Sequence, residues 1–305
     1  MKKGKKITIV TAFFDIGRNK YVKIPRSNDK YLRHFEFWAR IKNDLIVYTT
    51  ADLKTKILSI REKFNLKEKT KVIVIDDITK IEPAILTRMQ EIEHDNKFIA
   101  FRYLDDMPEN RALYNYVMML KSWFIYDASK MIKSDELLAW IDFGYNHGGD
   151  KFSDCNDFCF EWKYDFPDKV TYFYNKEINK KPVFYLVQSF ELNIMGAPFV
   201  VSKTYAKEHW DLIRNAMITL IDVGFIDDDQ ILMHMAYRKK PEIFNLMKSD
   251  WFMPLKDYGG EHLKIKCLQN KISFKDKMLK KYRIKKRNKT YLKKFKKEFL
   301  KDYLD

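Results

Sequence analysis

The stretch Leu137-Leu-Ala-Trp-Ile-Asp-Phe-Gly-Tyr145 decides the fold of this chain. Its five leading apolar residues are typical of a strand buried on both faces, as in the parallel sheet of an α/β protein. Asp142 follows this run directly, and α/β proteins bind ligands at the carboxyl ends of such strands. We therefore expect Asp142 to form the floor of a binding site. The alternative is that Asp142 and Gly144 only make a turn.

Strand-like and helix-like segments alternate through the first half of the chain. Apolar and β-branched runs predict strands at residues 7–14, 45–48, 71–75 and 137–141. Apolar residues at helical spacing predict helices at residues 31–39, 53–64 and 110–133. This alternation is typical of an α/β fold with a mostly parallel central sheet and helices on both faces.

The second half of the chain is less regular. Residues 146–182 are rich in Asn, Asp, Lys and aromatic residues, which predicts an excursion of loops and short strands. Two more strands are expected at 183–187 and 194–202, the second broken by Gly196 and Pro198. Helical spacing resumes at 205–220 and after residue 230. Gly196 either lets the backbone approach a bound sugar or phosphate, or marks a β-bulge.

The composition indicates a globular protein with one main domain. Of 305 residues, 46% are hydrophobic, and no run of about 18 apolar residues could span a bilayer. The basic start runs straight into the first strand without a signal-peptide pattern, so we expect a cytoplasmic protein. We also expect Cys155, Cys159 and Cys267 to be reduced structural thiols.

A basic tail follows this domain. Residues 271–305 contain 15 lysines and arginines against four acidic residues, within a chain of net charge +16. Aromatic residues repeat every fourth position at Tyr291, Phe295, Phe299 and Tyr303. This pattern predicts a domain over 1–265 and a basic amphipathic helix over 266–305 that binds an anionic membrane surface. The alternatives are a nucleic-acid-binding tail and a helix packed on the body or on a second subunit.

Three acidic residues and an amide precede the expected helix after residue 230. They are Asp227, Asp228, Asp229 and Gln230. Asp228 and Asp229 are our candidates for a general base or for contacts with the molecule that accepts a transferred sugar. Gln230 adds an amide that can bind sugar hydroxyls. The alternative for any one of these acids is ordinary helix capping.

The first strand delivers polar residues to its tip. Thr11 lies within it, and Asp15, Gly17 and Arg18 follow, a set typical of a nucleotide site. Divalent cations such as Mn²⁺ or Mg²⁺ commonly bind two carboxylates in an Asp-x-Asp pair beside a diphosphate. Gly144 stands where the second carboxylate would be. A metal ion on Asp142 would therefore need another ligand, for which His262 is our candidate.

These segments resemble the HtrL/YibB family. The resemblance covers residues 7 to 260 and is carried by Thr8–Arg18, Leu45–Thr49, Lys121-Ser122 and Trp140–Tyr145. That family is grouped with glycosyltransferases of the GT-A fold and is associated with bacterial surface-polysaccharide loci. The resemblance thus implies a GT-A-like enzyme that moves a sugar from a nucleotide sugar to a lipopolysaccharide or capsule glycan.

The resemblance also implies roles for particular residues. Asp142 would be the metal- or phosphate-binding acid, Lys121 would face the donor, and the segment from Asp15 to Arg18 would lie at the nucleotide end. Our leading hypothesis is a cytoplasmic glycosyltransferase held at the inner membrane by its tail. A non-catalytic sugar-nucleotide-binding or scaffold protein is the alternative, because the second acid is missing. A nucleic-acid-binding protein is disfavoured because the excess basic residues lie in the tail and not in the body.

Overall fold

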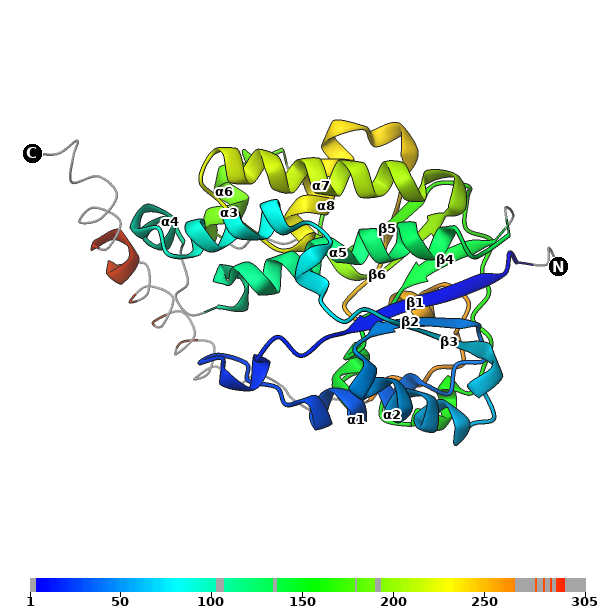
Figure 1. Ribbon diagram of the computed structural model, residues 1–305. Coiled ribbons are helices and arrows are strands. Elements are labelled where there is room, and N and C mark those ends of the chain that lie inside the picture. The colour runs from blue at the N-terminus through cyan, green and yellow to red at the C-terminus, as the bar shows by residue number, and fades with distance from the viewer. Residues whose placement is uncertain are drawn as a thin grey trace, which may run out of the picture.

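The computed structural model describes residues 4–102, 107–133, 136–178, 180–189, 193–266, 278, 282, 286 and 289–293. Within them the chain forms a seven-stranded sheet in the order β3-β2-β1-β4-β6-β5-β7 (Figure 1). The strands are β1 (Ile7–Phe13), β2 (Leu45–Thr49), β3 (Thr70–Val74), β4 (Leu137–Trp140), β5 (Val170–Tyr174), β6 (Ile194–Ser202) and β7 (Phe244–Lys248). Strand β6 runs antiparallel to both of its neighbours, and the other neighbouring pairs are parallel.

Helices cover both faces of this sheet. They are α1 (Asn28–Trp38), α2 (Ala51–Glu62), α3 (Pro83–Glu93), α4 (Asn96–Phe101), α5 (Ala112–Ser129), α6 (Val183–Ser189), α7 (Ala206–Asp222), α8 (Asp229–Lys239) and α9 (Pro254–Asp257). In Figure 1, α1 and α2 lie below the sheet, and α3, α5, α7 and α8 lie above it. The predicted α/β fold with a mostly parallel, helix-flanked sheet is confirmed.

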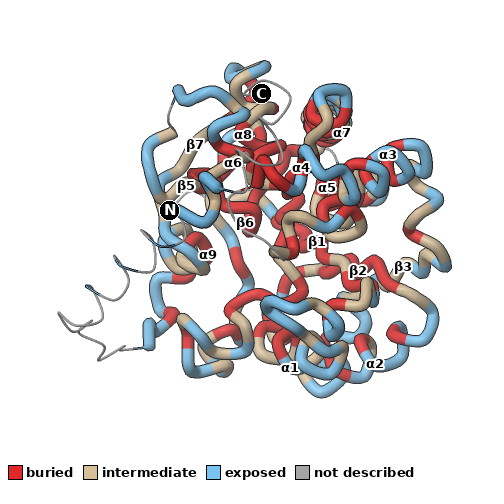
Figure 2. Tube along the Cα trace, turned by 90° about the vertical axis from the view of Figure 1, so that its left-hand side faces the viewer, coloured by how far each residue is buried: buried red, intermediate tan, exposed pale blue. Residues whose placement is uncertain are grey.

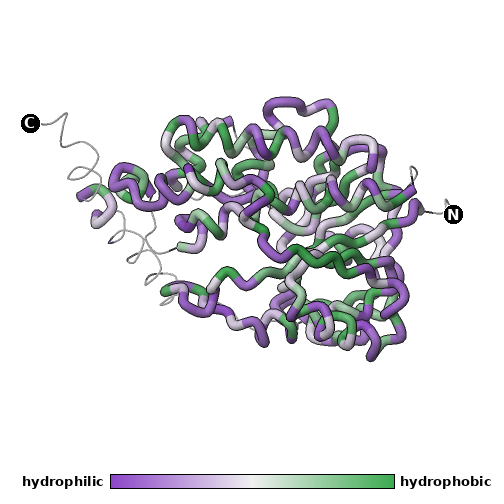
Figure 3. Tube along the Cα trace, in the orientation of Figure 1, coloured by the Kyte–Doolittle hydropathy of each residue, from purple (hydrophilic) through white to green (hydrophobic). Residues whose placement is uncertain are grey.

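Alternate residues of β4 serve two separate cores. Leu138 and Trp140 pack into the core under α5 and α7, whereas Leu137 and Ala139 pack into the core over α1. The central strands, among them β1, β2 and β6, are accordingly buried in Figure 2 and largely apolar in Figure 3, whereas the edge strands β3 and β7 are only partly buried. A strand covered on both faces needs apolar residues at every position, which explains the continuous run in the sequence.

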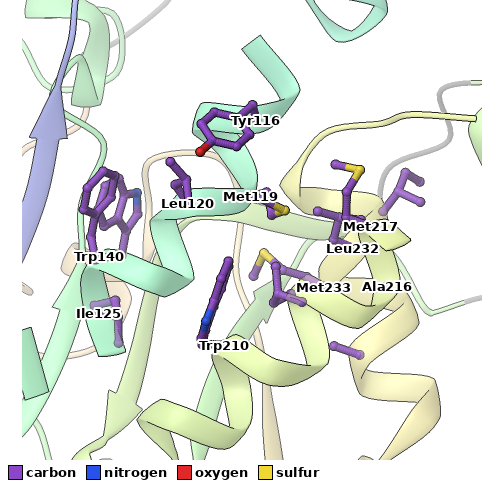
Figure 4. Close-up of a cluster of buried hydrophobic side chains, with 14 of the residues drawn as sticks. Tyr116, Met119, Leu120, Ile125, Trp140, Trp210, Ala216, Met217, Leu232 and Met233 are labelled. Atoms are coloured by element: carbon purple, nitrogen blue, oxygen red, sulfur yellow. The ribbon is translucent and has the colours of Figure 1, made fainter. Parts of the chain in front are cut away.

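Helix α5 is fixed between the sheet and two other helices. Met119 and Leu120 of α5 lie in the same core as Met217 of α7 and Met233 of α8, and Trp140 closes this core from β4 (Figure 4). All five side chains are at most 3% exposed. This packing holds the residue after Leu120, which is Lys121, at a set place near the ends of the strands.

The structure corrects two of the predicted elements. Residues 183–187 were predicted as a strand and belong to helix α6. Leu186 and Val187 are buried there while Phe184 and Tyr185 are exposed, a helical pattern that so short an apolar run does not reveal. Strand β6 was predicted to be broken but runs unbroken over nine residues. The irregularity shows instead in its pairing with β5, whose register shifts between Tyr172 and Tyr174.

Little of the basic tail is among the described residues. Phe295, Phe299, Tyr303 and Cys267 lie outside them, and the division at residue 265 stays a prediction. Residues 289–293 are helical, and the hydroxyl of Tyr291 donates to the carbonyl of Phe101 at 3.1 Å. Cys155 and Cys159 carry free thiols. In the described part of the chain, no helix is both long enough and apolar enough to cross a membrane.

Candidate active site

A pocket of about 480 Å³ opens at the carboxyl ends of β1 and β4. Its wall includes Arg18, Lys121, Asp142 and Asp229, together with several aromatic side chains. The volume lies in the range of roughly 300–1,000 Å³ that is usual for small-molecule sites. This is the edge of the sheet at which the sequence predicted a site.

The antiparallel course of β6 brings distant residues to this edge. Trp140 of β4 pairs with Phe199 of β6, so the start of β6 lies beside the end of β4. Continuing that register places Asp142 level with Ala197, next to Gly196. Helix α8 packs on β6 and begins at Asp229. Two segments from the second half of the chain therefore meet Asp142.

Lys121 of α5 contacts one residue from each of three segments: the loop after β4, strand β6 and helix α8. Its Nζ lies 2.8 Å from Asp142 Oδ1, 2.6 Å from Asp229 Oδ2 and 3.4 Å from the carbonyl oxygen of Gly196. Burial by itself would lower the pKa of Lys121, but the carboxylates of Asp142 and Asp229 outweigh it and hold the pKa above its ordinary value. Lys121 is therefore an ammonium ion. Trp140 fixes Asp142 further, because its Nε1 donates to Asp142 Oδ1 at 2.8 Å.

The three adjacent aspartates have three different roles. Asp227 accepts two hydrogen bonds from the buried Arg102, at 2.7 and 3.3 Å. Asp228 caps α8, since its Oδ1 accepts from the backbone N–H of Gln230 at 3.1 Å. Asp229 binds Lys121. The capping alternative thus describes the contacts of Asp228, while Asp229 is held in the pocket by an ammonium ion.

Burial raises the pKa of both Asp228 and Asp229. Burial, reinforced by the neighbouring Asp229 and Asp227, raises the pKa of Asp228 well above its ordinary value. Burial raises the pKa of Asp229 to about 6, although Lys121 opposes the shift. Asp229 is therefore mainly a carboxylate at pH 7.

Gly196 allows β6 and α8 to approach each other. A Cβ atom on this residue would lie 2.4 Å from Asp229 Oδ2, far inside van der Waals contact. The alternative considered for Gly196 was a β-bulge. The register between β5 and β6 does shift close to this residue. The close approach in the structure is to a side chain of the protein.

Arg18 is part of the pocket wall. It is 7% exposed, and its guanidinium carbon sits 4.8 Å from the ring centroid of Tyr21 and 4.9 Å from that of Tyr114. Nη2 donates to the carbonyl of Ile24 at 3.2 Å. Nε and Nη1 are buried without a hydrogen-bond partner in the described chain. Arg18 is thus held in place with donors left for an anion.

Arg26 and His147 lie in the pocket wall with Trp251 and Phe252. Arg26 Nη2 is 3.0 Å from His147 Nε2, and His147 Nδ1 is 3.0 Å from Asp150 Oδ2. Burial, together with the charge of Arg26, lowers the pKa of His147. A neutral ring satisfies both contacts, because Nδ1–H donates to Asp150 while Nε2 accepts from Arg26. The ring of Phe252 contacts His147 edge-on at 5.0 Å.

A left-handed turn holds His147 in this position. The φ angles of Asn146, His147, Gly148 and Gly149 are 56°, 45°, 73° and 124°. Such angles are rare outside glycine, and asparagine tolerates them better than most residues do. The side chain of Asn146 supports the turn, since it donates to the carbonyl of Phe152 at 2.9 Å and accepts from two backbone N–H groups.

The predicted site residues divide into two groups. Those in the pocket wall are Arg18, Lys121, Asp142, Gly144, Gly196, Asp228, Asp229 and Gln230. The others are Thr11, Asp15, Gly17 and His262. Thr11 is buried inside β1, and exposed Asp15 accepts from the N–H of Gly17 and from Asn28. His262 is exposed and lies 2.9 Å from the carbonyl oxygen of Asp157.

Sequence reasoning missed several lining residues. Among them, Glu109 has a buried Oε2 without a partner in the described chain, and burial raises its pKa. Glu109 lies just before α5, where an acid is ordinary, so its position carries no signal. Arg26, Trp251 and Phe252 come from loops whose sequences have no periodicity. Only the tertiary fold brings these three residues together in the pocket wall.

The residues around Asp142 do not suit a divalent cation. Lys121 contacts both Asp142 and Asp229, and Gly144 offers no side-chain ligand. His262 is absent from the pocket wall. Among the described residues, no group of three or more His, Cys, Asp or Glu side chains could hold a metal ion.

The comparisons identify the family. Residues 5–259 match the family model described as "Bacterial protein of unknown function (HtrL_YibB)". Protein HtrL of Escherichia coli strain K12 is 30% identical over 264 residues, which are 80% of this chain and 90% of that protein. The fold and the site define an α/β protein with a pocket at the carboxyl ends of β1 and β4. The chain belongs to the HtrL/YibB family.

Solved structures of low similarity were also found. Mouse xyloside xylosyltransferase 1 in its apo form is 10% identical with a TM-score of 0.39, over 79% of this chain and 85% of that one. The 4-diphosphocytidyl-2C-methyl-D-erythritol synthase of Anaerococcus prevotii is 14% identical with a TM-score of 0.36, over 91% and 97%. The PaToxG glycosyltransferase is 11% identical with a TM-score of 0.34, over 78% and 70%. At these values no residue role is transferred to this chain.

Proposed function

We propose that this protein is a glycosyltransferase that uses a nucleotide-sugar donor and that the pocket is its active site. One observation carries the proposal: Arg18 and Arg26, neither of which forms an ion pair with a carboxylate in the described chain, line the same pocket as Asp142 and Asp229. Guanidinium groups suit a diphosphate, and carboxylates suit sugar hydroxyls. The resemblance to GT-A enzymes points the same way.

The donor diphosphate would bind at Arg18 in the pocket wall. The buried N–H groups of Arg18 would donate to phosphate oxygens, and the rings of Tyr21 and Tyr114 keep the guanidinium in place. Lys121 would add a second positive charge close to Asp142. These cations would stabilise the charge that develops as the nucleoside diphosphate leaves.

Asp229 is our candidate for the general base. An acceptor hydroxyl oxygen would form the new bond to the anomeric carbon while the bond from that carbon to the phosphate oxygen breaks. The hydroxyl proton would pass to the Asp229 carboxylate, and the electron pair of the broken bond would leave with the diphosphate. Asp228 lines the same pocket and would form a hydrogen bond with a sugar hydroxyl.

The acceptor would bind on the side of Trp251 and Phe252. Trp251 is 38% exposed, unusually open for so large an apolar side chain, and it lines the pocket. Aromatic faces are suitable platforms for sugar rings. The family resemblance suggests a lipopolysaccharide or capsule glycan as the acceptor.

The tail would bring the enzyme to the cytoplasmic face of the inner membrane. Met278, Tyr282 and Leu292 are each more than half exposed. Exposed apolar residues among lysines suit an anionic bilayer surface. Flotation of the whole protein with phosphatidylglycerol vesicles, lost at high salt, is expected. Equal binding to neutral vesicles, or binding to RNA in place of vesicles, would contradict this part of the proposal.

A thermal-shift panel tests the donor. UDP-, GDP-, ADP-, dTDP- and CMP-sugars are added to the protein, and a donor that binds the native state raises its melting temperature. The stabilising donor is then incubated with the enzyme, and release of its nucleotide is measured. Asp142→Asn should abolish this release, whereas Asp154→Asn, at an exposed residue that only caps a 3₁₀ turn, should not. Release that survives Asp142→Asn would refute the assignment of the site.

A sugar-nucleotide-binding protein without catalysis is the second candidate. It is favoured by Gly144, which replaces the second carboxylate of an Asp-x-Asp pair. In that case a nucleotide sugar would raise the melting temperature, but no sugar transfer or hydrolysis would follow with any acceptor tried.

A further inference from the structure

We infer that the ammonium group of Lys121 is the resident cation of this pocket, so that the site binds its diphosphate ligand without a divalent metal ion. The identity of the ligand rests on the proposed function. The assignment of the cation rests on the contacts of Lys121.

The ammonium group satisfies all of its hydrogen-bonding capacity within the protein. It has three N–H donors, and three oxygens surround it: Asp142 Oδ1, Asp229 Oδ2 and the carbonyl oxygen of Gly196. Two of these oxygens belong to carboxylates, the ligands that Mg²⁺ and Mn²⁺ prefer. A metal ion bound between the same two carboxylates would have to expel Lys121.

Lys121 has little freedom to leave. It is 4% exposed, and its Nζ lies 5.9 Å from the centroid of the Trp140 ring. Met119 and Leu120, which precede Lys121 in α5, are fully buried in the core between the sheet and α7. This packing opposes a shift of the helix that would withdraw the side chain of Lys121. Movement of the ammonium group away from Asp229 would also leave a buried carboxylate unpaired, which is costly.

Glu109 and Asp228 also line the pocket, but no group of three or more His, Cys, Asp or Glu side chains in the described chain could hold a metal ion. Mg²⁺ is often held by one or two carboxylates together with substrate phosphates. Asp142 and Asp229 would be those carboxylates, and both contact Lys121. His147 has both ring nitrogens engaged, by Arg26 and by Asp150. A fixed ammonium ion therefore takes the place that a hydrated metal ion would need.

A titration of Mn²⁺ alone tests this assignment without any nucleotide. Free Mn²⁺ is followed by its electron paramagnetic resonance signal as the full-length protein is added. The wild type should show no saturable site. Lys121→Met, which removes the ammonium group, keeps most of the apolar side chain and frees both carboxylates, should gain one site that the double variant Lys121→Met/Asp142→Asn lacks. Circular dichroism and melting temperature establish that each variant is folded.

Two results would overturn the assignment. One is a saturable Mn²⁺ site in the wild type that Asp142→Asn removes, a measurement that does not depend on the folding of any Lys121 variant. The other is a folded Lys121→Met protein that gains no Mn²⁺ site.

A calorimetric titration then tests the ligand. The nucleotide that stabilises the protein most in the thermal-shift panel is titrated in EDTA and again in Mn²⁺, and the two dissociation constants should agree. Tightening by Mn²⁺ of about tenfold or more would contradict metal-independent binding. If no nucleotide binds under either condition, the proposed function fails, while the Mn²⁺ titration still decides the role of Lys121.

Discussion

The carboxylate of Asp229 occupies the space in which a side chain on residue 196 would begin. A Cβ atom on Gly196 would lie 2.4 Å from Asp229 Oδ2 and 2.7 Å from Oδ1. The same carboxylate is 2.6 Å from Lys121 Nζ. The absence of a side chain at residue 196 therefore sets the position of Asp229 and, through it, the position of the ammonium group.

Gly196→Ala should disable the pocket and leave the fold intact. The added methyl group must push Asp229 away, which we expect to lower nucleotide affinity or turnover by about tenfold or more and stability by about 1–3 kcal/mol. Calorimetry and urea unfolding measure the two effects. Gly224→Ala is the control, because Gly224 has a φ of 80° and open space around it and does not line the pocket. If both variants lose stability and neither loses affinity, the role given to Gly196 is wrong.

The rate of sugar transfer should depend on the ionisation of Asp229. Burial raises the pKa of this carboxyl to about 6, so the carboxylate needed as a base is lost as the pH falls through that value. We expect kcat/KM to fall on the acidic side of about pH 6 and to level off above it. Asp229→Asn should remove most of the activity at every pH. A profile without an acidic limb in the wild type would exclude Asp229 as the base.

Arg102→Met should destabilise the protein strongly. Arg102 is the partner of buried Asp227 and also donates to the carbonyl of Val187 at 2.8 Å. Removal of one partner from a buried ion pair typically costs about 3–5 kcal/mol. Arg88→Met is the matched control: its pair with Asp222 is about half exposed, and such pairs contribute roughly 1 kcal/mol or less. Urea unfolding compares the two variants, and equal losses would contradict the prediction.

Arg18→Met should weaken binding of the nucleotide rather than the fold. Methionine keeps an apolar side chain at this position but removes the guanidinium, which lies over the rings of Tyr21 and Tyr114, together with its buried N–H donors. We expect the dissociation constant to rise by about tenfold or more, since charge-assisted hydrogen bonds are the stronger ones. Arg33→Met, at an exposed residue of α1, should have no effect. Unchanged affinity in Arg18→Met would remove Arg18 from the donor site.

Trp251→Ala should separate donor binding from acceptor binding. If the exposed ring is a platform for the acceptor, the thermal shift given by the donor should be unchanged while transfer to an oligosaccharide acceptor falls. Hydrolysis of the donor by water serves as the internal reference. An equal loss of donor binding would place Trp251 on the donor side.

Local patterns predicted the fold well because they report local constraints. The continuous apolar run before Asp142 follows from burial of β4 on both faces, and the helical spacing of α5 follows from its packed face. Residues 183–187 were predicted wrongly because a short apolar run is equally compatible with a strand and with a helix.

The sequence alone could not predict that Asp227, Asp228 and Asp229 have different partners. Their residue types are identical, and their partners decide their roles. Arg102 lies 125 positions from Asp227 in the sequence, and Lys121 lies 108 positions from Asp229. No periodicity connects such distant residues. The same holds for Arg26 and His147, which are 121 positions apart.

The antiparallel course of β6 also has a consequence for how the protein folds. Lys121 and Asp142 can be brought together by the first half of the chain, but Gly196 and Asp229 reach them only after β6 has been inserted between β4 and β5. Contacts of such large sequence separation form slowly, because the intervening loop must close first. Folding intermediates that lack β6 would leave Lys121 with Asp142 as its partner but without Asp229, and the pocket would be incomplete. Ligand added during refolding should therefore stabilise the last step and leave the earlier ones unaffected.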